Sequence, residues 1–205
     1  MKKYSKNYIV IAQLAIVLFL SFVVVTTARA GSWSVNIGGT TFSFPTFVVK
    51  TYDPTYDLYK TFMSLMSSGV QMKAMPYALI QKLDPYYENN LNKVRYGHAS
   101  RLVDTAITDC TKIYFSSKDM TDAIAKNTPL TASSMRWLLH ELAHTEQCYK
   151  VGGREAYAKM WFKDLGTALV TPPFSSNDMK EIHDKMPMEK DAEAKAVQVR
   201  TQLGI

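Results

Sequence analysis

The feature that most constrains this chain is the pentapeptide His140-Glu141-Leu142-Ala143-His144, which lies in a segment of helical pattern from Ser133 to Val151. Each residue of an α-helix turns by about 100°, so His144 lies about 40° round from His140 and one turn further along. Both imidazoles can therefore reach one metal ion, while Glu141 is offset beside them. The opposite face is apolar and can anchor the helix in a core; it comprises Met135, Leu138, Leu142 and Tyr149.

The ligand types of this segment indicate zinc (Zn2+). Two neutral imidazoles and one carboxylate are a common ligand set of catalytic zinc sites, which keep a fourth position open. Glu141 is then placed to act as general base on a zinc-activated water. The carboxylate that we predict as the third ligand is Glu189, near the start of a helix that begins at Pro187. The alternative for Glu189 is a solvated acidic residue at a helix N-terminus, which the helix dipole favours.

Two polar residues are candidates for supporting these ligands from behind. Glu193 follows Glu189 by four residues on the same helix face, where it can accept a hydrogen bond from the free ring N–H of a ligand histidine. Gln147 follows His144 by three residues and also shares its face. Gln147 either contacts the surroundings of a ligand or is an ordinary polar helix residue.

Two further side chains are candidates for stabilising an oxyanion. His183 precedes Glu189 by six residues across a turn, and the alternative is a surface histidine. Tyr157 can serve the same purpose, and the alternative is a core aromatic residue that packs with Trp161.

The first thirty residues have the order of a secretory signal peptide. Three lysines precede an apolar run from Ile9 to Val25, and small residues lead to Ala30. We therefore predict cleavage after Ala30 and one exported domain, residues 31–205, that is secreted or periplasmic and has no membrane span. An uncleaved N-terminal anchor is the alternative.

Export would place the two cysteines in an oxidising compartment. We predict a disulfide between Cys110 and Cys148, because a pair of cysteines in a secreted chain usually forms one. The alternative is two separate buried thiols. Cys148 also follows His144 by four residues, so its thiolate could instead ligate the metal.

The charge distribution argues against a nucleic-acid partner. The whole chain has 24 Lys and Arg against 18 Asp and Glu, but residues 1–30 hold four of the basic residues and no acidic one. The remainder is nearly balanced and has no basic run. Nucleic-acid binders usually concentrate basic residues on one face, so we expect none here.

The pattern of elements predicts an α+β fold that is mainly helical. A β-hairpin is predicted from Trp33 to Phe44, with a Gly38-Gly39 turn that pairs Trp33 with Phe44. Short strands are predicted at 94–96 and 112–115, and 99–107 is open between helix and loop. The predicted helices are 55–72, 76–83, 133–151, 154–165, 177–185 and 187–203.

Residues 94–200 resemble small secreted zinc-metallopeptidase-like proteins of the gluzincin type. The resemblance lies in His-Glu-Leu-Ala-His-Thr-Glu-Gln (140–147), the Gly-Gly turn that follows it, and Pro-Met-Glu-Lys-Asp-Ala-Glu (187–193). Gluzincins usually carry Asp at the position of Glu193. The resemblance implies a zincin-like minimal metallopeptidase fold. It also implies that Ile113, Tyr114 and Phe115 form a strand whose edge binds the substrate backbone.

These expectations converge on an exported zinc metallopeptidase that hydrolyses peptide bonds in a peptide or protein substrate. The alternative is a non-catalytic zinc-binding domain that serves as an exported binding or assembly module. An open coordination position favours the enzyme, whereas a fourth protein ligand favours the binding module.

Overall fold

The computed structural model describes residues 32–37, 40–45, 55–102, 104–170 and 179–205. The chain divides into two compact units, Met1–Leu58 and Tyr59–Ile205. The described part is α+β and mainly helical, which confirms the predicted class. The predicted signal peptide, residues 1–30, lies outside the described residues.

In the first unit, β1 (Ser32–Ile37) and β2 (Thr40–Pro45) form an antiparallel pair. Trp33 lies opposite Phe44, and Val35 lies opposite Phe42. This is the register that the two-residue Gly-Gly turn predicts, although the turn itself lies outside the described residues.

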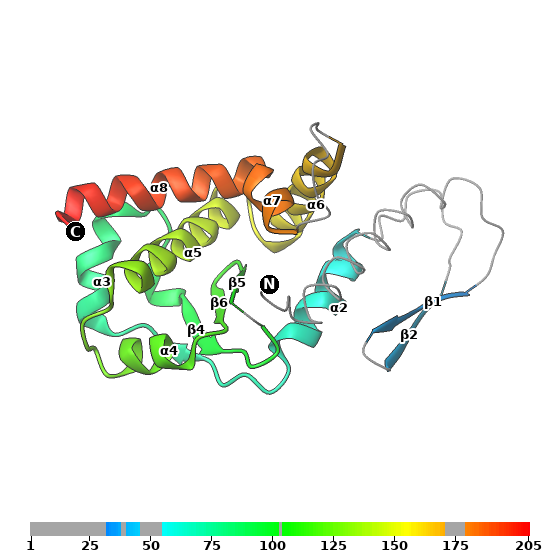
Figure 1. Cartoon of the computed structure of the whole chain (residues 1–205), viewed down its shortest axis with the longest axis horizontal. Coiled ribbons are helices and arrows are strands. Elements are labelled where there is room, and N and C mark those ends of the chain that lie inside the picture. The colour runs from blue at the N-terminus through cyan, green and yellow to red at the C-terminus, as the bar shows by residue number, and fades with distance from the viewer. Residues whose placement is uncertain (1–31, 38–39, 46–54, 103, 171–178) are drawn as a thin grey trace, which may run out of the picture. The chain divides into compact units, whose positions relative to one another are not determined.

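The second unit contains a four-stranded mixed sheet in the order β3-β4-β6-β5, of which Figure 1 labels β4, β6 and β5. The strands are β3 (Lys73–Ala74), β4 (Arg95–His98), β5 (Ala106–Asp109) and β6 (Lys112–Phe115). β4 runs parallel to β6, whereas β5 runs antiparallel to β6 and lies at the margin of the sheet. The margin strand β5 is therefore the antiparallel neighbour of β6, and β4 is its parallel neighbour.

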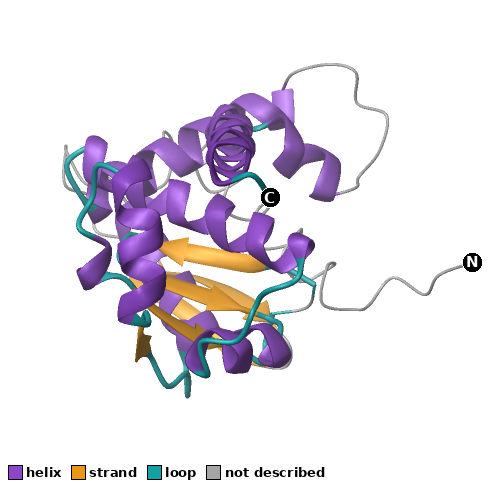
Figure 2. Cartoon of the chain, turned by 90° about the vertical axis from the view of Figure 1, so that its left-hand side faces the viewer, coloured by secondary structure: helices purple, strands orange, loops and turns teal. Residues whose placement is uncertain are grey.

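Helices account for most of the remaining described chain (Figure 2). They are α2 (Thr55–Ser67), α3 (Tyr77–Leu83), α4 (Lys118–Ala125), α5 (Ala132–Lys150), α6 (Arg154–Val170), α7 (Met179–Lys185) and α8 (Pro187–Leu203). Two short 3₁₀ turns, η1 (Asp84–Tyr86) and η2 (Leu91–Lys93), lie between α3 and β4. None of the described helices combines the length and the apolar character needed to cross a membrane.

Helix α5 lies between α8 and the sheet, where it contacts both β5 and β6 (Figure 1). Leu138, Leu139 and Leu142 on α5 are at most 1% exposed and pack in the same core as Ile113 and Phe115 of β6. Full burial of one such side chain stabilises the fold by roughly 1.5–3 kcal/mol. The core therefore fixes how α5 is rotated, and with it the direction of its histidines.

Several elements differ from the sequence prediction. β3 and α4 were not predicted, α2 ends at Ser67 rather than at residue 72, and β5 replaces part of the segment that was open between helix and loop. α6 continues through Gly166 to Val170, because one glycine in a helix costs only about 1 kcal/mol, which packing can offset. The N-cap of α5 is Thr131, whose hydroxyl accepts a hydrogen bond from the amide of Ser134.

Candidate metal centre

Three side chains from two helices converge on one point. Nε2 of His140 and Nε2 of His144 lie 3.1 Å apart. Oε2 of Glu189, the third residue of α8, lies 3.1 Å from Nε2 of His140 and 3.0 Å from Nε2 of His144. The two histidines follow from their spacing on α5, and Glu189 arrives because α8 packs along α5. This group could hold a metal ion.

The far side of the His144 ring is fixed by Gln147. Nδ1 of His144 lies 2.8 Å from Oε1 of Gln147, while Nε2 of Gln147 donates to the carbonyl of Met188 at 2.8 Å. A carbonyl only accepts, so the amide orientation of Gln147 is set and its oxygen must face the imidazole. Nδ1 of His144 therefore carries the proton, and in the neutral ring the lone pair lies on Nε2, toward Glu189.

The His140 ring has a corresponding partner on α8. Oε2 of Glu193 lies 3.5 Å from Nδ1 of His140, and Oε1 of Glu193 accepts from Nε of Arg136 at 2.7 Å. The carboxylate favours a proton on Nδ1, which directs the lone pair of Nε2 toward Glu189. The Glu193 side chain is 35% exposed, so water weakens this interaction more than it weakens the one at Gln147.

The protonation of the group shows what a metal ion would replace. Burial lowers the pKa of His144, but Glu189, Glu141 and Gln147 together outweigh burial and raise it to about 9. Burial raises the pKa of Glu189, but His144 and His140 outweigh burial and lower it below its ordinary value. One positive charge thus compensates the buried carboxylate, and a divalent ion can take the place of that proton.

Glu141 lies beside this group and is not part of it. Its side chain is buried, and Oε2 accepts a hydrogen bond from the hydroxyl of Thr108 at 2.7 Å. Oε1 has no hydrogen-bond partner among the residues that the structure describes, and this atom is not fully buried. One oxygen of Glu141 is therefore held by the protein, while the other keeps contact with solvent.

The strand next to the centre is β5, and this corrects one prediction. Ile113, Tyr114 and Phe115 do form a strand, β6, but it pairs with β4 on one side and β5 on the other. Strand addition needs a free edge, and β6 has a paired strand on both sides. The prediction that they form the substrate-binding edge is therefore wrong. In the described part of the sheet, β5 pairs with β6 alone and lies at the margin.

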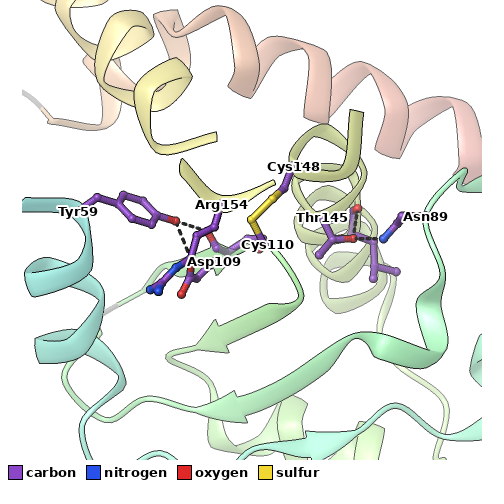
Figure 3. The surroundings of a disulfide bond; sticks show 9 residues. Tyr59, Asn89, Asp109, Cys110, Thr145, Cys148 and Arg154 are labelled. Carbon is purple, nitrogen blue, oxygen red and sulfur yellow. Dashed lines mark hydrogen bonds and ion pairs between the residues drawn. A yellow bond between two sulfur atoms is a disulfide. The ribbon is translucent and has the colours of Figure 1, made fainter. Parts of the chain in front are cut away.

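The disulfide between Cys110 and Cys148 is present, as predicted, with 5.2 Å between the two Cα atoms (Figure 3). It excludes Cys148 as a free thiolate ligand. The bond joins the β5–β6 turn to the end of α5, one turn beyond His144. Beside it, Oδ1 of Asp109 lies 2.6 Å from Nε of Arg154 and accepts from the hydroxyl of Tyr59 at 3.2 Å. This end of β5 is therefore held by a covalent bond and an ion pair.

One candidate oxyanion donor contacts the carboxylate of Glu189, and the other lies beside the ring of His144. Nε2 of His183, on α7, is 3.1 Å from Oε2 of Glu189, and its side chain is 48% exposed. The ring of Tyr157, on α6, lies 6.5 Å from that of His144 between centroids. Burial, followed by Tyr59 and Glu189, raises the pKa of Tyr157 well above its ordinary value, so its hydroxyl remains a donor.

Sequence reasoning missed two residues of this centre. Arg136 lies one turn before His140 on the same face of α5, and this spacing was a usable signal for its contact with Glu193. Thr108 had no comparable signal, because its position depends on the pairing of β5 with β6.

Comparison with models of protein families, with curated proteins and with solved structures finds no match to this chain.

Proposed function

We propose that this chain is an exported zinc metallopeptidase that hydrolyses peptide bonds. The observation that carries the proposal is the convergence of His140, His144 and Glu189 within 3.1 Å of one another, with Glu141 beside them. Three protein ligands and a neighbouring carboxylate are the set required for hydrolysis, whereas structural zinc sites use four protein ligands.

The donor set fits zinc in both chemistry and size. Magnesium and calcium prefer oxygen ligands, whereas zinc accepts imidazole nitrogen and carboxylate oxygen together. Tetrahedral bonds of about 2.0–2.2 Å would separate the ligand atoms by roughly 3.3–3.6 Å. The separations here are 3.0–3.1 Å, so small side-chain shifts suffice. When bound, zinc supplies Lewis acidity for the scissile carbonyl and for the attacking water.

Glu141 is the proposed general base. Its accessible Oε1 accepts a proton from the attacking water and then delivers that proton to the leaving amine. Tyr157 and His183 are the proposed donors to the oxyanion that develops on the carbonyl oxygen. The contact of His183 with Glu189 and the position of Tyr157 beside the ring of His144 support these roles.

We further propose that the second unit has a zincin-like minimal metallopeptidase fold. The support is a small mixed sheet whose antiparallel margin strand, β5, lies next to the helix that carries both histidines. An extended peptide substrate would add to the margin of β5 by main-chain hydrogen bonds. The Cys110–Cys148 disulfide supports export through the predicted signal peptide, residues 1–30.

The test is zinc analysis of the purified mature protein, combined with digestion of a broad peptide library. We expect one zinc ion per chain and cleavage by the native protein. Glu141→Gln should retain the zinc and lose cleavage, because the substitution removes the base and no ligand. Glu155→Gln, an exposed glutamate on α6, is the matched control and should behave as the native protein. Bound zinc without cleavage by either protein would favour the non-catalytic binding module.

A further inference from the structure

We infer that Thr108 is the positioning residue for Glu141, and that it links the carboxylate of the base to the strand margin where a peptide substrate would bind. The inference rests on the proposed function. Its basis is the place of one residue, whose side chain contacts Glu141 and whose main chain belongs to the margin strand β5.

The side chain of Thr108 has one dominant partner. Its hydroxyl lies 2.7 Å from Oε2 of Glu141 and 3.3 Å from the main-chain oxygen of Glu141. A hydroxyl has a single proton, so the shorter contact to the charged oxygen receives it. Thr108 is 5% exposed and Glu141 is 4% exposed, so water competes little for this bond. The bond leaves Oε1 of Glu141 as the oxygen that can accept a proton.

The main chain of Thr108 points away from β6. Residues 110 and 111 form the two-residue turn between β5 and β6, and Asp109 lies opposite Lys112. Hydrogen-bonded and non-hydrogen-bonded pairs alternate along an antiparallel ladder, and the pair that flanks such a turn is hydrogen-bonded. The pair Thr108–Ile113 is therefore not hydrogen-bonded. The carbonyl of Thr105, three residues earlier, accepts from the amide of Ser116, which agrees with this alternation.

The outward groups of Thr108 are thus the ones that an added strand would meet. The hydroxyl of Tyr59 lies 3.5 Å from the carbonyl of Thr108, at the limit of a hydrogen bond. A substrate N–H that takes over the carbonyl of Thr108 must therefore displace the hydroxyl of Tyr59, which keeps its shorter contact with Asp109. One residue would then bond the substrate by its main chain and the base by its side chain.

The surroundings hold Thr108 in register with α5. The residue two positions later, Cys110, is covalently joined to Cys148, and Asp109 is paired with Arg154 (Figure 3). Sliding of β5 along α5 would break both contacts. Substrate pairing with β5 therefore acts on a strand of fixed register, and the position of the Thr108 hydroxyl sets the position of Glu141.

The kinetic test compares Thr108→Val and Thr108→Ala with Thr108→Ser. The assay uses a quenched-fluorescent peptide of the best-cleaved library sequence. We expect kcat to fall by about 10- to 100-fold in the two variants without a hydroxyl, because the base loses its fixed geometry, while KM changes little. Thr108→Ser should restore kcat. Thr121→Val removes a buried hydroxyl from α4 and is the matched control, with kcat unchanged. Equal kcat in all variants that bind zinc would overturn the inference.

A second readout does not depend on activity. In protein labelled with ¹³C at the glutamate carboxyl carbon, the signal of Glu141 is identified by its absence in Glu141→Gln. We expect this signal to shift in Thr108→Val and Thr108→Ala and to keep its native position in Thr108→Ser and Thr121→Val. An unchanged signal in Thr108→Val would overturn the inference even if no peptide is cleaved. Cleavage that survives in Glu141→Gln would instead reject the proposed function.

Discussion

Oε1 of Gln147 lies 2.8 Å from Nδ1 of His144, and the amide nitrogen of the same side chain donates to the carbonyl of Met188. Gln147 therefore joins α5 to α8 at the residue just before Glu189. It sets the tautomer of His144 and contacts the main chain next to Glu189. We therefore expect substitution of Gln147 to weaken metal binding more than it destabilises the fold.

The first prediction concerns Gln147→Met, which keeps the length of the side chain and removes both hydrogen bonds. We expect zinc affinity to fall by about 10- to 100-fold, the usual effect of removing a partner of a metal-bound histidine. The measurement is competition for zinc with a chromophoric chelator. Gln198→Met, an exposed glutamine on α8, is the control and should bind as the native protein does. Native affinity in Gln147→Met would show that the amide does not support the ligand.

The second prediction concerns pH. Burial lowers the pKa of His144 in the metal-free protein, but Glu189, Glu141 and Gln147 together outweigh burial and raise it to about 9. The ring therefore holds a proton at neutral pH that zinc must displace. We expect zinc affinity to increase as the pH rises from about 6.5 toward about 9, with proton release on binding. Titration calorimetry in buffers of different protonation enthalpy measures both quantities. Affinity that is constant over this range would contradict the assignment of His144 as a ligand.

The same pKa shift makes the stability of the metal-free fold change with pH in the direction opposite to zinc affinity. A raised folded-state pKa stabilises the fold fully below the ordinary value of 6.5, and this contribution is lost as the pH rises through about 9. The metal-free protein should therefore lose stability over the range in which zinc binding gains strength. Urea unfolding with and without zinc at several pH values would show the two trends diverging.

The third prediction concerns the disulfide. Cys110 and Cys148 are 38 residues apart, and closing a loop of this length stabilises a fold by roughly 4 kcal/mol in the chain-entropy model. We expect the double variant Cys110→Ser/Cys148→Ser to lose about 2–5 kcal/mol of unfolding free energy, measured by urea denaturation. Reductant should destabilise the native protein similarly and leave the double variant unchanged. An effect of reductant on the double variant would point to some other cause.

The fourth prediction concerns Gly97 in β4. A Cβ atom at this position would lie 2.5 Å from Cγ1 of Val70 and 2.9 Å from the main-chain oxygen of Gln71. The backbone contact cannot be relieved by a rotamer change, so Gly97→Ala should destabilise the second unit by about 1–3 kcal/mol. Adding Val70→Ala should recover only part of the loss, because the clash with Gln71 remains. Full recovery in the double variant would show that the backbone contact is unimportant.

Much of the centre was predictable because it depends on local spacing. The two histidines share a face for the same reason that any residues four apart on a helix do, and Pro187 indicates the start of α8. The cysteine pair followed from its number and the expected export. The register of the N-terminal hairpin followed from a two-residue turn.

The parts that were not predictable depend on contacts between distant segments. The run Ala-Ile-Thr-Asp of β5 is too short to show a period, and it becomes a strand by pairing with β6. Its turn contains Cys110 at φ 54°, a conformation that typical turn sequences assign to Gly or Asn. Because β5 was not predicted, no sequence pattern indicated that β6 lies inside the sheet or that Thr108 lies beside Glu141.

The most direct test of the account is anomalous diffraction at the zinc absorption edge from crystals of the zinc-loaded protein. We predict a single protein-bound peak whose contacts are Nε2 of His140, Nε2 of His144 and a carboxylate oxygen of Glu189, each at about 2.0–2.2 Å. The fourth position should carry no protein ligand, and Glu141 should remain outside direct contact. A zinc peak bound elsewhere, or one coordinated by Glu141 in place of Glu189, would contradict the account.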